Sequence, residues 1–243
     1  MATHRLHSAC TLCLLAQGVV LIASPVHASE AWAGSIAIAT DYIYRGISQT
    51  RGGPALQGGV QLQTPTGWSA GLWGSTVDFH SRRGPSYEIA LHAARAWSLG
   101  PDWSAQLSAA HHEYPNEART DYDYGELTAS LSFQQRVTAS VAWSPNTSRY
   151  GDGRMAANRR ALSYEMTVLQ PLNAHWSLSA GAGHYDLRDL FGTGYWFWNT
   201  GIAFSWDTLQ VDLLHIDADA TADRLFGYSA SGGRWTAAFT WRF

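Results

Sequence analysis

Residues 67–71 read G-W-S-A-G and so match the G-x-S-x-G spacing of the nucleophile elbow found in hydrolases. In that motif the serine sits on a sharp turn that follows a strand and precedes a helix. In this sequence the five residues follow a turn and begin an alternating strand pattern, and no helical pattern comes after them. The sequence therefore predicts no catalytic residue and no enzymatic activity.

Two other clusters contain the residue types that bind metal ions. Residues 111–113 read H-H-E, but neighbouring residues of a strand point to opposite faces, so His112 and Glu113 cannot both reach one site. Asp217, Asp219 and Asp223 form a loose acidic cluster in a polar segment, for which we prefer the interpretation of a solvated loop. We expect neither a metal site nor a cofactor.

Seven charged residues share a more suggestive property, because each falls on the polar face of a segment in which apolar and polar residues alternate. They are Asp41, Arg45, Glu88, Glu126, Glu165, Asp212 and Arg234. If the polar faces line a lumen, these residues predict a ring of mixed charge in the outer half of a narrow pore, where it would filter solutes by size and charge. The alternative is that the groups pair with one another and fill a lumen too narrow to conduct.

The closing segment shows the alternation most clearly. From residue 233 to residue 243, one face carries Trp235, Ala237, Phe239, Trp241 and Phe243, and the other carries Arg234, Thr236, Ala238, Thr240 and Arg242. One face suits lipid and the other suits water, and a tilted strand of about ten residues is long enough to cross a bilayer. Bacterial outer-membrane barrels commonly end on such an aromatic residue, so we expect Phe243 to be recognised by the barrel assembly machinery.

Twelve segments alternate in this way. They are residues 34–44, 55–64, 68–77, 86–98, 103–114, 122–133, 136–144, 160–170, 175–186, 195–206, 209–215 and 233–243. Short connections alternate with long ones, and the strand number is even. This pattern predicts an all-β fold, a transmembrane antiparallel up-and-down β-barrel of about 12 strands. A β-sandwich would instead need polar outward faces.

The composition agrees with a barrel. Only 14% of the 243 residues are charged, and the net charge of −3 gives no reason to expect nucleic acid as a partner. Residues 1–28 read as a signal peptide, with Arg5 before an apolar core and a small-residue cleavage site that ends at Ala28. Both cysteines lie in this segment, so residues 29–243, the predicted barrel, contain none.

The sequence also makes local predictions for five residues. Tyr42 and Tyr44 fall on the lipid face near the outer interface, where girdle aromatics belong. Arg45-Gly46 also has a structural interpretation beside the pore-lining one, in which Gly46 permits a turn that other residues cannot make and Arg45 braces the first loop. Arg95 falls on the outward face beside Trp97, which indicates either a snorkelling side chain or a β-bulge.

The first predicted strand and the loop after it also carry a family resemblance. Residues 41–50 read D-Y-I-Y-R-G-I-S-Q-T, residues 54–59 read P-A-L-Q-G-G, and residues 67–75 read G-W-S-A-G-L-W-G-S. These stretches resemble the TorF-type family of proteobacterial outer-membrane porins, densely over residues 34–79 and thinly as far as Phe243. The motif positions are Tyr42, Arg45, Gly46, Ser48, Gln49, Pro54, Gln57 and Gly58. The resemblance implies an outer-membrane barrel and supplies no catalytic residue.

Together these observations predict a porin-like channel for passive diffusion of small polar solutes across the bacterial outer membrane. Its expected partners are outer-membrane lipid, the assembly machinery and an unidentified solute. The alternative is a non-conducting outer-membrane barrel with a lipid-directed enzymatic role or a structural or adhesion role.

Overall fold

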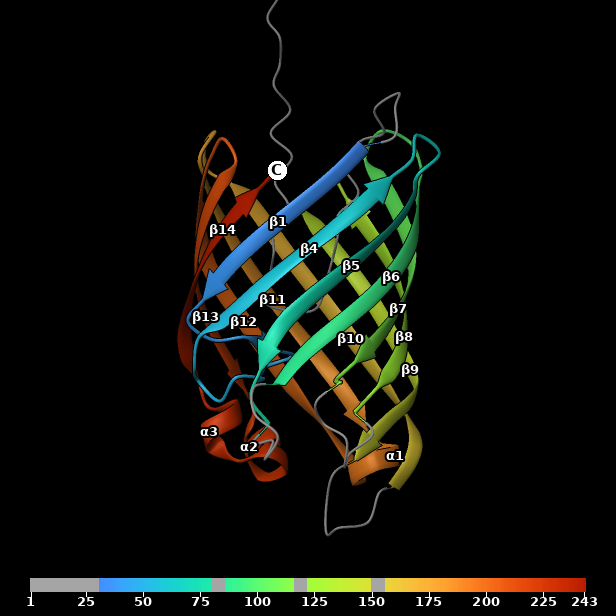
Figure 1. Ribbon diagram of the computed structural model, residues 1–243, viewed down its shortest axis with the longest axis vertical. Coiled ribbons are helices and arrows are strands. Elements are labelled where there is room, and N and C mark those ends of the chain that lie inside the picture. Colours follow the sequence, from blue (N-terminus) through green and yellow to red (C-terminus); the bar gives the residue numbers. More distant parts are fainter. Residues whose placement is uncertain (1–30, 80–85, 116–121, 150–155) are drawn as a thin grey trace, which may run out of the picture.

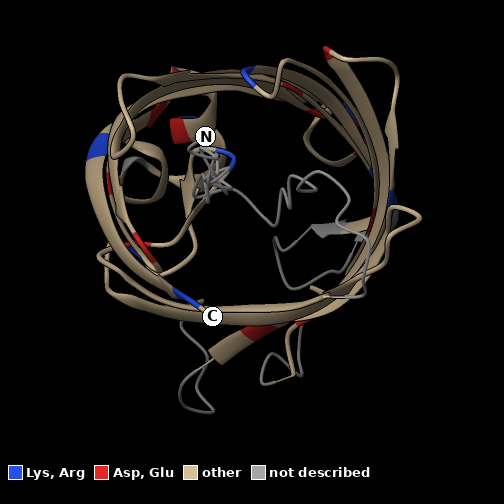
Figure 2. Ribbon diagram, turned by 90° about the horizontal axis from the view of Figure 1, so that it is seen from above, with Lys and Arg blue, Asp and Glu red and all other residues tan. Residues whose placement is uncertain are grey.

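The computed structural model describes residues 31–79, 86–115, 122–149 and 156–243, and the predicted signal peptide lies outside them. Across these residues, twelve strands form a closed antiparallel barrel (Figures 1 and 2). The barrel strands are β1 Ala31–Ala39, β4 Ala55–Gln63, β5 Trp68–Val77, β6 Ser86–Ser98, β7 Trp103–Glu113, β8 Tyr124–Phe133, β9 Val137–Arg149, β10 Ala156–Pro171, β11 Trp176–Leu187, β12 Thr193–Trp206, β13 Leu209–Ala218 and β14 Arg234–Arg242. The predicted fold class is therefore confirmed.

Each barrel strand pairs with its neighbour along the chain, and the pairing of β1 with β14 closes the cylinder. This seam continues beyond the last strand residue. The Phe243 amide donates to the Gly34 carbonyl at 3.0 Å, and the Gly34 amide donates to the Phe243 carbonyl at 2.7 Å. The tight turn predicted at Gln134 and Gln135 is also present, since both residues have positive φ angles of 49° and 56°.

Apolar side chains cover the outside of the barrel, and polar side chains line the inside. Leu91 and Trp235 are each 64% exposed on the outer face. On the inner face, Ser144, Ser163 and Thr240 are each 1% exposed. This arrangement is the reverse of a water-soluble sheet protein, and it follows from the alternation of the sequence, because successive residues of a strand point to opposite faces.

Arg95 stays on the outer face of β6. Its guanidinium lies 5.1 Å from the ring centroid of Trp68 and 5.8 Å from that of Trp97. The register of β6 with both neighbouring strands is continuous past this position, so there is no bulge here. The guanidinium contacts two aromatic rings on the outer face, and the snorkelling interpretation stays a prediction.

Two segments predicted as loops contain short helices. Residues 187–194 include α1 (Arg188–Phe191), and residues 216–232 include α2 (Ala220–Phe226) and α3 (Tyr228–Ser231). All three lie at the end of the barrel opposite the carboxy terminus (Figure 1). None of the helices in the described residues has the length and apolar character needed to cross a membrane.

The acidic cluster of the last loop consists of three separately engaged carboxylates. Asp219 is the N-cap of α2, where its side chain accepts hydrogen bonds from the Thr221 and Ala222 amides. Asp223 accepts a hydrogen bond of 2.6 Å from the Ser231 hydroxyl, and Asp217 accepts one from the Ala218 amide. Each group has a structural role in this loop.

The first predicted strand is wrong at its end. We predicted strand as far as Tyr44, but β1 ends at Ala39, and residues 40–54 form a separate loop. Within it, β2 (Ile43–Tyr44) pairs with β3 (Ile47–Ser48) as a small hairpin. Alternation alone cannot place this boundary, because the polar–apolar pattern continues into the hairpin.

Candidate functional site: the lumen and its inward loop

Residues 40–54, which we call the inward loop, fold into the lumen. The Tyr42 hydroxyl donates to Glu88 of β6, and the Tyr195 hydroxyl of β12 donates to the Arg45 carbonyl at 2.9 Å. Ile43 is buried against two inward-facing residues of β13, Leu214 and Ile216. These contacts reach inner faces on widely separated parts of the wall, so the loop crosses the interior of the barrel.

Arg45 makes the densest set of contacts. Its Nη1 and Nη2 lie 2.9 Å and 3.1 Å from the two carboxylate oxygens of Glu126, and its Nε lies 3.0 Å from Oε1 of Glu165. The guanidinium carbon is 4.6 Å from the ring centroid of Tyr44 and 4.7 Å from that of Tyr185. With 4% of its side chain exposed, Arg45 ties the loop to the wall strands β8, β10 and β11.

The tip of the hairpin explains how Arg45 reaches the wall. Arg45 and Gly46 are the two turn residues, with φ angles of 49° and 81°. A two-residue hairpin turn with positive φ at both positions favours Asn, Asp or Gly, so an arginine is unusual there. A Cβ on Gly46 would lie 2.8 Å from Cβ of Phe197. The structure agrees with the structural interpretation of this pair, since Gly46 permits the turn and Arg45 braces the loop.

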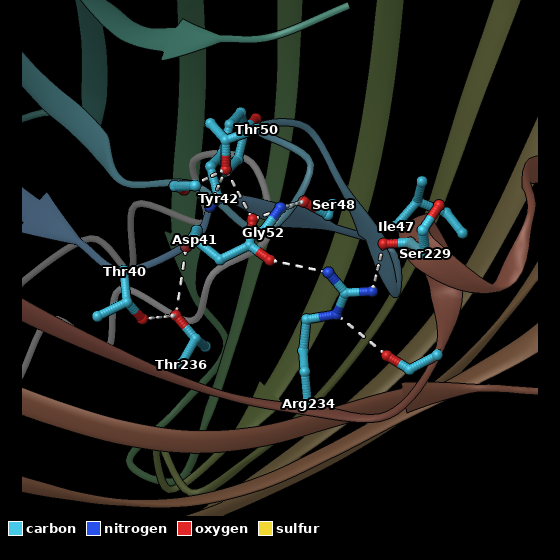
Figure 3. Close-up of polar contacts among 12 residues, drawn as sticks. Thr40, Asp41, Tyr42, Ile47, Ser48, Thr50, Gly52, Ser229, Arg234 and Thr236 are labelled. Atoms are coloured by element: carbon cyan, nitrogen blue, oxygen red, sulfur yellow. Dashed lines mark hydrogen bonds and ion pairs between the residues drawn. The ribbon is translucent and has the colours of Figure 1, made fainter.

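Asp41 anchors the other end of the loop. One carboxylate oxygen accepts hydrogen bonds from Ser48 at 2.6 Å and Thr50 at 2.7 Å, and the other lies 3.2 Å from Nη1 of Arg234 on β14 (Figure 3). Arg234 also donates to the carbonyls of Ser229 and Gly232, which fixes its side chain. This cluster joins the loop to the closing strand.

A third cluster lies on the wall at β6 and β7. Glu88, 2% exposed, lies 2.7 Å from Nδ1 of His112 and accepts the hydrogen bond of 3.1 Å from Tyr42. The His112 ring stacks on Tyr124 with centroids 4.5 Å apart. We did not assign His112 to the site, although the alternation of residues 103–114 places it on the inner face. Glu113 lies on the other face, as predicted, and is 55% exposed.

Six of the seven predicted lumen charges therefore belong to the contacts of the inward loop. Asp212 does not join them. It accepts hydrogen bonds of 2.7 and 2.8 Å from Nε2 of Gln210, whose oxygen in turn accepts one from Arg242. Asp212 is buried on the inner face of β13 but belongs to a separate polar cluster.

The prediction for Tyr42 and Tyr44 is wrong. Neither lies on the lipid face, because the loop turns inward before them. Tyr42 is 3% exposed and packs edge-on against Trp73. Tyr44 donates a hydrogen bond to Glu126 at 3.3 Å. Their hydroxyl groups bind carboxylates inside the barrel instead of lipid headgroups at its rim.

The remaining motif residues also build the inward loop or its exit. Ser48 binds Asp41, the Gln49 amide donates to the Tyr42 carbonyl at 2.7 Å, and Pro54 directly precedes β4. On β4, Gln57 donates to Ser75, and a Cβ on Gly58 would lie 3.3 Å from the Ser35 carbonyl. The motif thus encodes how the loop is held and how the chain returns to the wall.

The described residues contain no group of three or more metal-ligating side chains that could hold an ion. The serine of the G-x-S-x-G pattern, Ser69, lies on strand β5. The contacts that the structure describes in this interior are ion pairs, hydrogen bonds and aromatic contacts.

Solved structures of similar fold include porins. A NanC porin aligns with a TM-score of 0.56 and 10% identity, over 86% of this chain and 98% of its own. A KdgM porin aligns with a TM-score of 0.54 and 6% identity, over 87% and 99%. At these identities the likeness shows the fold alone. No curated protein matches the chain significantly. Residues 23–243 match the family described as "Bacterial protein of unknown function (Gcw_chp)", and the chain therefore belongs to that family.

Proposed function

We propose that this protein is a porin-like channel through which small polar solutes diffuse passively across the bacterial outer membrane. One observation carries the proposal, namely a closed cylinder with an apolar outer face, a polar inner face and a charged loop folded into its lumen. An apolar belt suits lipid, and a hydrophilic bore suits water and dissolved solutes. The likeness to porin structures and the TorF-type motif support the same function.

The inward loop is the proposed constriction. Asp41 and Arg45 belong to the loop, Glu88, Glu126, Glu165 and Arg234 contact it from the wall, and Asp212 lines the lumen apart from them. Fixed charges in a narrow pore select solutes by size and charge. We propose these residues as the lining that solutes meet.

A second candidate is a non-conducting barrel with a structural or lipid-directed role. It is favoured by the way the loop charges pair with one another and by the apolar packing of Ile47 against Tyr195, Phe197 and α2. These contacts occupy part of the lumen.

Recordings in planar lipid bilayers separate the two candidates. The channel predicts discrete conductance steps from the purified, folded protein, and larger steps from a variant in which Gly-Gly replaces residues 42–50. If neither protein conducts although both are folded, the channel is wrong and the non-conducting barrel remains. If only the shortened variant conducts, the loop closes the pore.

We also propose that lipid covers the apolar belt and that the assembly machinery recognises Phe243. The Phe243 ring is 59% exposed beside Trp241, with ring centroids 5.1 Å apart. A Phe243→Ser variant should therefore insert less efficiently into the outer membrane, as measured by surface protease accessibility in cells. Unchanged insertion would remove this role from Phe243.

A further inference from the structure

We propose that the barrel wall contains a binding site for the guanidinium or ammonium group of an organic cation, formed by Glu126, Glu165 and Tyr185, and that Arg45 occupies this site as an internal ligand. The proposal rests on the proposed channel function for the solute to reach the lumen. It names a solute class for that channel, namely small organic cations.

The wall side of the site has the groups that recognise a planar cation. Glu126 offers both carboxylate oxygens to one edge of the guanidinium, and Glu165 offers one oxygen to the Nε side. Tyr185 offers its ring at 4.7 Å. Bidentate carboxylate pairing and an aromatic face are the two preferred modes of guanidinium recognition, and both are strong where water is excluded.

These three wall residues belong to the barrel and not to the loop. Glu126 lies on β8, Glu165 on β10 and Tyr185 on β11, each within a continuously paired stretch of strand. Ser163 donates a hydrogen bond of 2.8 Å to Glu165 and so orients that carboxylate independently of Arg45. The wall side of the site can therefore persist when the loop does not supply its arginine.

Arg45 lies in a hairpin turn whose backbone conformation does not favour arginine. Its φ angle of 49° is a conformation that costs an ordinary L residue roughly 1–2 kcal/mol. The side-chain contacts in the wall site give a physical reason to keep an arginine at this position. Because the arginine is tethered, its effective concentration at the site is high, so a free cation competes weakly in the natural protein.

The charge around the loop also favours a cation. Asp41, Asp78, Glu88, Glu126 and Glu165 supply five carboxylates, whereas Arg45, Arg51 and Arg234 supply three guanidinium groups. Arg234 is engaged with Asp41 and two carbonyls. When Arg45 leaves the wall, Glu126 and Glu165 lose their cation, and a solute with the same headgroup can replace it.

The test uses methylguanidinium chloride as the probe and the full mature barrel in detergent. An Arg45→Ala variant should bind the probe saturably by calorimetry, with half-saturation on the order of millimolar for so small a ligand. Binding should raise the melting temperature of the variant, whereas potassium chloride at equal ionic strength should not. The natural protein should show a far smaller response, because Arg45 already fills the site.

Two further variants make the test specific. Arg45→Gly suits the positive φ of the turn and replaces the alanine variant if that protein does not fold. Adding Glu126→Gln and Glu165→Gln to either variant should abolish the saturable response. No saturable binding by a folded Arg45 variant, or binding that survives both glutamine substitutions, would overturn the proposal.

The two proposals fail separately. Binding is measured in detergent and needs no ion current, so a conducting barrel whose Arg45 variants bind no methylguanidinium refutes only the cation site. A barrel whose Arg45 variants bind the probe but which never conducts refutes only the channel.

Discussion

Arg45 and Glu126 pair inside the barrel although 81 residues separate them in the sequence. The sequence identified both as lumen charges, because the alternation places them on polar faces. It could not identify them as partners, since pairing depends on the path of the loop through the interior. The same limit hid His112, Tyr185 and the hydrogen-bonding roles of Tyr42 and Tyr44, whose partners come from distant strands.

An Arg45→Ala substitution should lower the free energy of unfolding by about 3–5 kcal/mol, because it leaves two buried carboxylates without their cation. Urea unfolding in lipid vesicles measures this. Arg160→Ala is the matched control, since Arg160 is 68% exposed and pairs with Asp189 on the surface. We expect a loss of no more than about 1 kcal/mol there. Equal losses in both variants would contradict the bracing role of Arg45.

Gly46→Ala should destabilise the protein more than Gly192→Ala. Both glycines have positive φ angles, of 81° and 74°, so each substitution carries backbone strain of about 1 kcal/mol. A Cβ at position 46 would also press on Phe197 at 2.8 Å, whereas one at position 192 has no atom within 4 Å. This crowding adds about 1–3 kcal/mol. Thermal unfolding of the two variants side by side gives the difference.

At the scale of elements, the barrel strands were predictable and the loop structures were not. The predicted bounds of β5 and β6 agree with the structure, because each strand alternates between turn or loop signals, with Arg95 as the one charged exception on the outward face of β6. The helix α2 was missed, because seven residues are too few to show a helical period. One available signal was Asp219, a favoured N-cap residue directly before that segment.

Asp219 gives this element a pH dependence. Partial burial favours the neutral carboxyl, but the hydrogen bonds from the Trp196, Ala222 and Thr221 amides outweigh it and hold the pKa of Asp219 below its ordinary value. Since the folded-state pKa is depressed, the stabilisation is present above the unfolded-state pKa of about 3.9 and is lost as the pH falls through the folded-state value.

An Asp219→Asn substitution should therefore flatten the acid limb of stability below about pH 4. Asp219→Ala should cost about 1 kcal/mol at neutral pH through loss of the cap. Unfolding free energies measured at neutral and acid pH test both. An unchanged acid limb in Asp219→Asn would show that other carboxylates dominate it.

At the scale of the whole molecule, the two faces of the wall determine what surrounds it. Leu91 is 64% exposed in the middle of β6, and Leu172 is 53% exposed in the turn after β10. If lipid covers the belt, Leu91→Arg should cost about 2–4 kcal/mol and Leu172→Arg no more than about 1 kcal/mol. Unfolding from lipid vesicles compares the two. Equal costs would place Leu91 outside the hydrocarbon region.

The barrel architecture could be predicted because strand alternation, strand number and connection lengths are each readable from local sequence. The contacts inside the barrel could not be predicted, because they depend on the inward loop folding back across many strands. The wall residues that form side-chain hydrogen bonds with Asp41, Tyr42 and Arg45 lie on β6, β8, β10, β12 and β14, all of them later in the chain than the loop itself.

This order has a consequence for assembly. The inward loop is translated early, and the strands that enclose it follow later in the chain. The last of these strands, β14, contacts the loop through the ion pair of Arg234 with Asp41, and it closes the barrel by pairing with β1. Closure of the barrel and the contact between Asp41 and Arg234 therefore depend on the same strand, so a chain that stops short of β14 can form neither.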